Sequence, residues 1–293
     1  MHLVVLAVAI AIAWCWRAFR EPGSGSLSER WLWALTDFAM PPALVLVTAI
    51  AVAVMGADGQ MFGFAVGWLG AGSAIALLAW AASGGLRQAI ALGRLRRRVR
   101  SRPYLEVSGL SGAPCADSCS VRQLDLDAPF AAAIAGEITV SRGLTALLTP
   151  EQLAVVLVHE CGHLKFRDPL WFAGLGWVRW VSAWLPNTYK LWEELLCLRE
   201  LRADRWATQY VDPLLLAETL LLLAQQPLPP TKLLCAALSG DTPPSRLAQR
   251  ISALMAASDK TAVAEESQKR MRWSIGAAWS PLLLPLLVVP FHS

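Results

Sequence analysis

Two histidines and a glutamate stand close together in the segment His-Glu-Cys-Gly-His, residues 159–163. Residues four apart in a helix lie on one face about a turn apart, so His159 and His163 can direct their imidazoles at one zinc ion. Glu160 is adjacent to the first histidine and can take a proton from an attacking water. Zinc lowers the pKa of water and polarises the carbonyl of a peptide bond. The motif predicts zinc-dependent hydrolysis, with Glu160 as the catalytic base.

Chance could also produce this five-residue pattern, and the two histidines could be ordinary core residues. Only four histidines occur in the chain, however, and half of them fall in this motif. A catalytic zinc needs a third protein ligand and one open position. His2 and His292 lie at the two ends of the chain, which the topology argued below places across the membrane. A carboxylate is therefore the expected third ligand.

The carboxylate candidates lie in an acidic and basic run downstream of the motif. Glu200 is the first choice, and Glu193 and Glu194 are alternatives. Asp204 follows Glu200 by one helical turn on the same face, where it can accept a hydrogen bond from a ligand histidine. Taken alone, the run 199–205 is more typical of a solvated charged helix with Glu and Arg pairs.

A capped helix must position the motif. Thr149 is a suitable N-cap, Pro150 suits the first helical position, and Gln152 completes a capping box. The apolar run 153–158 carries this helix into the motif. Cys161 points away from the ligand face, so we assign it to packing.

A peptidase must also hold its substrate extended, and an edge strand beside the motif helix can do so by adding the substrate as a further strand. Strands are predicted at residues 121–127 and 134–141, where β-forming residues lie between turn residues. We predict that the second strand binds substrate through Ile134, Ala135, Gly136, Glu137 and Ile138, with the glycine allowing close backbone approach. Leu214–Gln225 and Leu247–Met255 are predicted to be packing helices.

The composition indicates a membrane protein. Hydrophobic residues make up 55% of the chain and charged residues 16%, against about a quarter in a soluble domain. A span needs about 20 apolar residues. Four spans are predicted, at residues 3–16, 38–56, 61–82 and 273–290, the second with Pro41 and Pro42 in its opening turn. The first lacks a basic start and a cleavage site, so we do not interpret it as a cleaved signal peptide.

Lysine and arginine gather on one side of these spans, at residues 17–30, 94–102 and 269–272. The positive-inside rule therefore places both termini outside and residues 83–272 in the cytoplasm. The apolar, tryptophan-rich segment 169–185 carries Arg179 and is interpreted as an interfacial or re-entrant helix, because a crossing would carry the downstream carboxylates away from the motif.

The predicted fold class is a mainly α integral membrane protein with four transmembrane helices and a cytoplasmic α+β zincin-like insert. Residues 1–86 would form three transmembrane helices, 87–272 the peptidase domain and 273–293 the fourth transmembrane helix. The lipid bilayer is thus an expected partner, whereas direct nucleic-acid binding is not expected, since the arginine run directly follows a span.

The sequence from Ala135 to Pro169, containing GEITVSRGL and TPEQLAVVLVHECGHLKFRDP, resembles the HExxH region of the BlaR/MecR-type membrane antirepressor peptidases. It is similar more loosely to the HtpX-like membrane peptidases, whose third-ligand segment reads ExxxD, as Glu200 and Asp204 do. Two features fit the BlaR/MecR group better than the HtpX-like group. They are the number of residues between His163 and Glu200 and the arrangement of three spans before the insert and one after it.

This resemblance implies that His159, His163 and Glu200 bind one zinc ion and that Glu160 is the general base. The implied substrate is a cytoplasmic or juxtamembrane protein. In the BlaR/MecR group this substrate is a winged-helix repressor, and its cleavage is a signalling step. Those receptors carry a penicillin-sensor domain after the fourth span, whereas this sequence ends at Ser293, so β-lactam sensing is not expected.

The alternative functions are a non-catalytic membrane regulator or scaffold on a peptidase-like fold and an HtpX-like quality-control protease. A transporter is disfavoured because the spans contain few ionisable residues.

Overall fold

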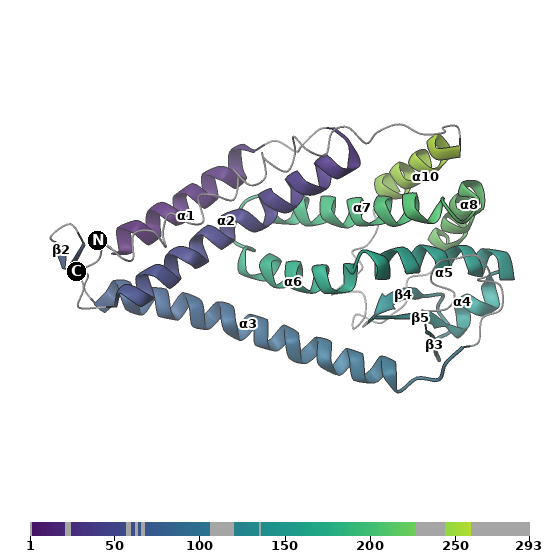
Figure 1. Cartoon of the computed structure of the whole chain (residues 1–293), viewed down its shortest axis with the longest axis horizontal. Coiled ribbons are helices and arrows are strands. Elements are labelled where there is room, and N and C mark those ends of the chain that lie inside the picture. Colours follow the sequence, from purple (N-terminus) through teal and green to yellow (C-terminus); the bar gives the residue numbers. More distant parts are fainter. Residues whose placement is uncertain are drawn as a thin grey trace. The chain divides into compact units, whose positions relative to one another are not determined.

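The computed structural model describes residues 2–20, 25–56, 60–61, 64–65, 68–105, 120–134, 136–226 and 244–258. These residues are mostly helical and include a small mixed sheet (Figure 1). The chain divides into two compact units. The first comprises Met1–Ala89, Leu175–Leu195 and Ala264–Ser293, and the second comprises Ile90–Gly174 and Leu196–Val263.

The first unit contains the long apolar helices. Helices α1 (His2–Phe19) and α2 (Leu27–Met55) pack against each other, and α3 (Trp68–Arg100) contributes its first two-thirds. Two short strands, β1 (Gln60–Met61) and β2 (Phe64–Ala65), pair antiparallel before α3. Apolar side chains from all three helices form its core, including Leu6, Val45, Val52 and Ala74.

Helix α2 begins earlier than predicted, at Leu27 instead of Phe38. Ser26 is its N-cap and forms a capping box with Glu29, whose carboxylate accepts the Ser26 N–H at 2.8 Å. The prediction that Pro41 and Pro42 lie in the opening turn is therefore wrong, because both prolines lie inside the helix.

Two helices, α2 and α3, are long and apolar enough to cross a membrane, which suggests membrane association. Helix α1 has 18 residues and spans about 27 Å, slightly less than the roughly 30 Å of a bilayer core. The third predicted span was placed too early, since residues 60–61 pair with residues 64–65 as β1 and β2 and the helix begins at Trp68. The fourth, 273–290, lies outside the described residues. Four spans thus remain a prediction.

The tryptophan-rich segment forms helix α6 (Asp168–Val181), whose 14 residues span about 21 Å and are too short to cross a bilayer. Its second half packs on α3 within the first unit. Trp177 Nε1 donates a hydrogen bond to the Ala81 carbonyl at 2.9 Å, and Trp180 stacks on Trp80 with ring centroids 4.2 Å apart. Packing accounts for these two tryptophans, and the interfacial location of α6 remains a prediction.

The second unit contains a three-stranded sheet in the order β3 (Val121–Leu124), β5 (Glu137–Ser141) and β4 (Ala131–Ile134). Strand β3 is parallel to the central β5, and β4 is antiparallel to it. The prediction of one strand over residues 134–141 is wrong: Ile134 ends β4, and Glu137 begins β5. Between them Gly136 has φ +89°, which glycine adopts without steric cost, so the chain reverses there. Ala135 lies outside the described residues.

Helices complete the second unit. They are α4 (Arg142–Leu147), α5 (Pro150–Lys165), the second part of α7 (Thr188–Ala207), α8 (Pro213–Ala224) and α10 (Pro244–Ser258). In Figure 1, α5 lies against β4 and β5, and it also contacts α8, which in turn packs on α10. The predicted capping box of Thr149 and Gln152 at the start of α5 is confirmed. The helices predicted at 214–225 and 247–255 are confirmed as α8 and α10.

Candidate metal centre and catalytic site

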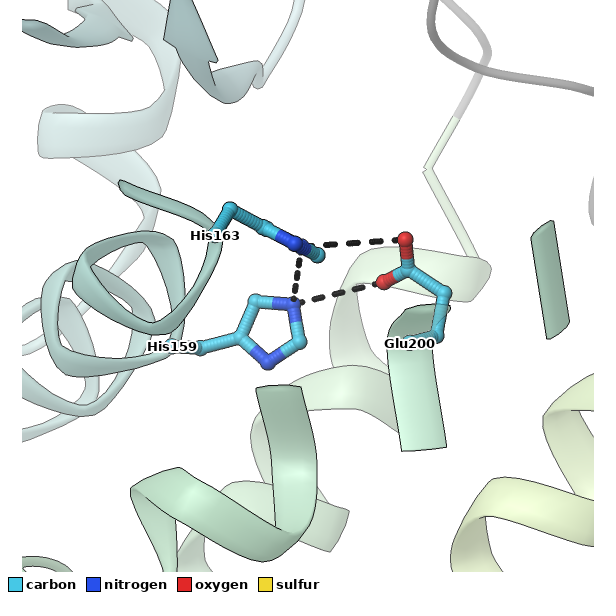
Figure 2. Close-up of side chains that lie close together, drawn as sticks. All are labelled: His159, His163 and Glu200. Carbon is cyan, nitrogen blue, oxygen red and sulfur yellow. Dashed lines mark hydrogen bonds and ion pairs between the residues drawn. The ribbon is translucent and has the colours of Figure 1, made fainter. Parts of the chain in front are cut away.

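Three side chains from two helices converge in the second unit (Figure 2). His159 and His163 project from α5, and Glu200 projects from α7. The two histidine Nε2 atoms lie 3.2 Å apart, and the Glu200 carboxylate lies 3.3 Å from His159 Nε2 and 3.7 Å from His163 Nε2. The structure therefore brings together the three ligands predicted from the sequence.

These separations fit one tetrahedral ion. Ligands held 2.0–2.1 Å from zinc at the corners of a tetrahedron lie roughly 3.3 Å from one another. Among the described residues, His159, His163 and Glu200 form the one group of metal-binding side chains close enough to share an ion. Glu194, an alternative ligand, instead pairs with Arg30 in the first unit at 2.6 Å. Glu193 is buried and is not in this group.

A carboxylate lies behind each histidine. Asp204 Oδ1 is 2.9 Å from His159 Nδ1, and Asp168 Oδ2 is hydrogen-bonded to His163 Nδ1 at 2.8 Å. Both aspartates are buried. A carboxylate at Nδ1 keeps the proton on that nitrogen and leaves Nε2 to bind a metal. Asp204 was predicted for this position. For Asp168, which follows the motif helix, the sequence left two roles open, support of a metal ligand or a contact at the helix end.

Arginines hold these carboxylates in turn. Arg250 of α10 binds Asp204 through Nε at 2.7 Å and Nη2 at 2.8 Å, and its Nη1 lies 3.3 Å from Glu200. Arg199 donates from Nε and Nη2 to the other Glu200 oxygen at 2.9 and 2.7 Å. Arg202 pairs with Asp168. Two guanidinium groups thus hold the ligand carboxylate, Arg199 at one oxygen and Arg250 at the other.

Sequence reasoning missed Arg250, although the sequence contains a signal for it. Arg250 lies at helical spacing from Leu247 and Leu254, on the face of α10 that becomes buried. An arginine on such a face requires an acidic partner, because a buried charge is costly when it is unpaired. The pattern does not say which acid that partner is.

The electrostatics of the centre favour a cation at Nε2. Burial acts to lower the pKa of His159, but hydrogen bonding to Asp204 and Glu200 outweighs it and raises the pKa to about 10. Burial acts in the same way on His163, and the Glu200 charge together with the bond to Asp168 raises that pKa. Burial would raise the pKa of Glu200, whereas Arg199 and His163 hold it well below its ordinary value. Without a metal, His159 therefore carries a second proton at neutral pH.

Glu160 lies beside this centre and is oriented by the sheet. Its Oε2 accepts a hydrogen bond from the Ala133 N–H at 2.8 Å, and the side chain is buried. Ala133 is in β4, the edge strand next to α5. A cavity of about 170 Å³ contains Glu160, His163 and Glu200 and is walled on one side by Ala131, Ala132 and Ala133. The carboxylate, the metal-binding group and the strand edge thus share one space.

Residues 120–185 match the sequence model of Peptidase family M48. The matched segment includes the sheet, α4, α5 and α6, so it contains His159, Glu160 and His163, whereas Glu200 lies beyond it. The chain matches no curated protein and no solved structure. The M48 match supports a metallopeptidase of the zincin type, and M48 peptidases typically depend on zinc. The side chains present at the centre fit that ion in number, type and spacing.

Proposed function

We propose that this chain is a membrane-embedded zinc endopeptidase that cleaves a cytoplasmic or juxtamembrane protein. His159, His163 and Glu200 bind one zinc ion, Glu160 is the general base, and Asp204 orients His159. The observation that carries the proposal is the spacing of 3.2, 3.3 and 3.7 Å between the three ligand side chains, with Glu160 in the same cavity.

The chain's own groups have distinct tasks in this proposal. Bound zinc supplies polarisation of the scissile carbonyl and of water. The Glu160 carboxylate takes the proton of the attacking water and passes it to the departing amine. Its bond to the Ala133 N–H orients this carboxylate before substrate arrives. Asp168 and Asp204 keep the imidazole rings in one orientation.

The substrate-binding strand is reassigned from residues 134–138 to β4, residues 131–134. Strand β4 is the edge of the sheet, and Ala133 directs its N–H to Glu160 and away from β5. An extended peptide can pair with this outer edge, which brings its backbone next to the catalytic carboxylate. Gly136 lies in the turn between β4 and β5 and Glu137 and Ile138 lie in the central strand, so these three residues do not form the edge.

The membrane arrangement and the substrate are part of the proposal. We place residues 83–272 in the cytoplasm, on the basis of the arginine and lysine distribution. The similarity to BlaR/MecR-type peptidases favours a winged-helix repressor as substrate. An HtpX-like quality-control role is the alternative, in which the chain would degrade misfolded membrane proteins.

The test uses the full chain in detergent or nanodiscs, with its zinc content and its cleavage of a protein substrate both measured. Glu160→Gln should retain one zinc per chain and lose about 100-fold or more of the cleavage rate, since removing a general base costs about 10²–10⁴-fold. Glu151→Gln, an exposed change on the same helix, is the matched control and should behave as the parent. Equal cleavage by the parent and Glu160→Gln would refute the assigned base. Stoichiometric zinc without cleavage in the parent would favour a non-catalytic regulator.

A comparison of proteins in cells carrying the parent or Glu160→Gln tests the substrate. The repressor proposal expects a fragment of a winged-helix protein that only the parent produces. A set of unrelated membrane-protein fragments would favour the quality-control role.

A further inference from the structure

The backbone of strand β4 has an inner and an outer side, and its register with β5 identifies them. The Phe130 carbonyl, just before β4, accepts the Ser141 N–H at 2.8 Å. In an antiparallel pair, residues that exchange hydrogen bonds with the neighbouring strand alternate with residues whose backbone groups point away from it. Ala132 and Ile134 follow Phe130 at this alternate spacing, so their N–H and C=O groups are directed at β5.

Ala131 and Ala133 therefore direct their N–H and C=O groups to the outer side of β4. The Ala133 N–H donates to Glu160 Oε2 at 2.8 Å, which confirms this direction. Ile138, the residue opposite Ala133 in β5, donates its own N–H away from β4, to the Ser120 carbonyl at 3.1 Å. Among the described residues, no strand pairs with the outer side of β4.

The two outward positions differ in what they contact. The Ala133 N–H is held by the Glu160 carboxylate, whereas no described residue accepts a hydrogen bond from the Ala131 N–H. Ala131 is half-buried, lies about 6.6 Å from Ala133 along the strand, and lines the same cavity as Glu160 and His163. Its backbone groups are thus within reach of a peptide that lies in this cavity.

The carboxylate is a stronger acceptor than a peptide carbonyl. A hydrogen bond to an ionised group is roughly twice as strong as one between neutral groups. A substrate carbonyl therefore does not displace Glu160 from the Ala133 N–H, and the donor that remains for it on this edge is the Ala131 N–H.

We propose that the outer edge of β4 divides its backbone groups between the substrate and the base. Ala131 pairs with the substrate backbone through both its N–H and its C=O. The Ala133 N–H stays bonded to Glu160 and holds it in place, while the Ala133 C=O accepts one further substrate N–H. Ala131 is thus a substrate-binding residue, and Ala133 is a positioning residue for the base. This inference rests on the proposed peptidase function, which supplies the substrate and the role of Glu160.

This pairing restricts the class of substrate. Two substrate N–H groups, two residues apart, must donate to the carbonyls of Ala131 and Ala133, and the N–H of the residue between them points away from β4. Proline lacks an N–H and is excluded from both paired positions. The amides of a helix are already bonded within the helix. The expected substrate is therefore an extended or unfolded segment of a protein.

Binding to the zinc-loaded Glu160→Gln variant of the full chain tests the pairing without requiring cleavage. The probes are fluorescent decapeptides that cover the sequence of casein, a protein without stable structure. The decapeptide that binds most tightly is then made with one N-methylated amide at each position in turn. Methylation should weaken binding at two positions that are two residues apart, by about 2- to 10-fold or more, as expected for the loss of one hydrogen bond. Methylation of the amide between them is the matched control and should have little effect.

Proline substitutions in β4 test the two alanines separately, since an edge strand tolerates proline where the N–H points away from the sheet. In the Glu160→Gln background, Ala131→Pro should weaken binding of the decapeptide by about 2- to 10-fold, and Ala133→Pro should leave it nearly unchanged. With Glu160 present, Ala131→Pro should mainly raise KM. Ala133→Pro should instead lower kcat by about tenfold or more, because a misplaced catalytic group costs up to about 10²-fold.

Stability measurements show whether the variants keep the fold. Ala132→Pro removes an N–H directed at β5 and should lower the unfolding temperature more than Ala131→Pro or Ala133→Pro does. Zinc content is measured for all three variants. The N-methylated peptides need no change in the protein, so their result stands even if a proline variant fails to fold.

Three results would overturn the pairing: no casein decapeptide that binds, equal binding of every N-methylated peptide, or an Ala133→Pro variant that weakens binding as much as Ala131→Pro and leaves kcat unchanged. The peptidase function is tested separately with the parent protein and denatured casein. If the methylation pattern is present and the parent cleaves nothing, the pairing stands and the peptidase proposal fails. If the parent cleaves casein and the pattern is absent, the peptidase proposal stands and the pairing fails.

Discussion

Each imidazole of the candidate metal centre has a carboxylate at its Nδ1, and the strength of metal binding should depend on it. Asp204 lies 2.9 Å from His159 Nδ1 and is itself bound twice by Arg250. Asp204→Asn keeps the size of the side chain and removes its charge. We expect zinc affinity to fall about 10- to 100-fold, as is usual for groups behind a metal ligand.

Chelator competition measures this affinity, and activity at saturating zinc should fall less than the affinity does. Asp125→Asn is the control, since Asp125 is an exposed aspartate in the same unit. Unchanged zinc affinity in Asp204→Asn would show that Asp204 does not support His159.

Zinc and protons should compete for the same nitrogens. The pKa of His159 is raised to about 10, because bonding to Asp204 and Glu200 outweighs the effect of burial, and that of His163 is also raised. A histidine whose pKa is higher in the folded than in the unfolded state stabilises the metal-free fold when it is protonated. This stabilisation is complete below the pKa of the unfolded state, about 6.5, and it is lost as the pH rises through the pKa of the folded state. At pH 7.5 zinc must therefore displace at least the proton on His159.

Calorimetry in buffers with different ionisation enthalpies measures this release. Zinc affinity should rise with pH up to about 10, where His159 loses its second proton. A binding enthalpy independent of the buffer would mean that the histidines are neutral before zinc binds.

The residue types of this centre can be predicted from the sequence better than their connections. Spacing alone placed His159 and His163 on one helical face, and the need for a third ligand pointed to a carboxylate. Arg250 was missed because its partners precede it by 46 and 50 positions, and no local pattern encodes a pairing at that range. The role of Asp168 was left open for a related reason. An aspartate is common in the first turn of a helix, so the sequence does not require a contact with His163, and that contact depends on how the chain turns at the end of α5.

At the scale of elements, the metal centre depends on the close approach of α5 and α7. Gly162 lies between the two ligand histidines, and a Cβ atom there would meet Trp206 at 3.1 Å and the Ala203 Cα at 3.4 Å. Trp206 and Ala203 belong to α7, the helix that carries Glu200. A larger residue at position 162 must push α7 away and lengthen the distances from Glu200 to both histidines.

We expect Gly162→Val to lower zinc affinity by about tenfold or more and Gly162→Ala to have a smaller effect, since alanine needs only a few tenths of an ångström of adjustment and favours the helix. Gly93→Val on α3 is the control, because a Cβ at Gly93 would meet no atom within 4 Å. Equal zinc affinity in Gly162→Val and the parent would show that the packing of these helices does not set the site.

Element prediction succeeded where the chain carries local stop and start signals. Thr149, Pro150 and Gln152 mark the start of α5, and each contact they imply is present. The strand predicted at 134–141 failed because two short strands joined by a tight turn have the same β-forming composition as one longer strand. Gly136 was interpreted as a site of close backbone approach, whereas its positive φ places it in a turn. Likewise, the second span was predicted to begin at Phe38 because residues 38–56 are apolar. Helix α2 begins earlier, after the N-cap Ser26, where polar residues form a capping box.

At the scale of the whole molecule, the charge distribution predicts an orientation that helix geometry alone does not determine. Helices α2 and α3 are apolar over a membrane-spanning length, and α3 ends in a segment rich in arginine, from Arg94 to Arg100. Moving this segment across a bilayer would be costly, since each arginine at the bilayer centre costs about 2.5–3.5 kcal/mol on the insertion scale. We therefore expect the arginine end of α3, and the metal centre that follows it, to face the cytoplasm.

Fusions of alkaline phosphatase and of a fluorescent protein test this orientation. Alkaline phosphatase forms its disulfides only outside the reducing cytoplasm. A fusion after Arg102 should therefore be fluorescent and lack phosphatase activity. A fusion at Ser293 should show the reverse if the predicted fourth span, residues 273–290, returns the chain to the outside. Neutralising the six arginines at positions 94, 96, 97, 98, 100 and 102 should weaken this difference, since they dominate the charge bias. Phosphatase activity after Arg102 in the parent sequence would place the metal centre outside, and a cytoplasmic repressor would then be out of reach as a substrate.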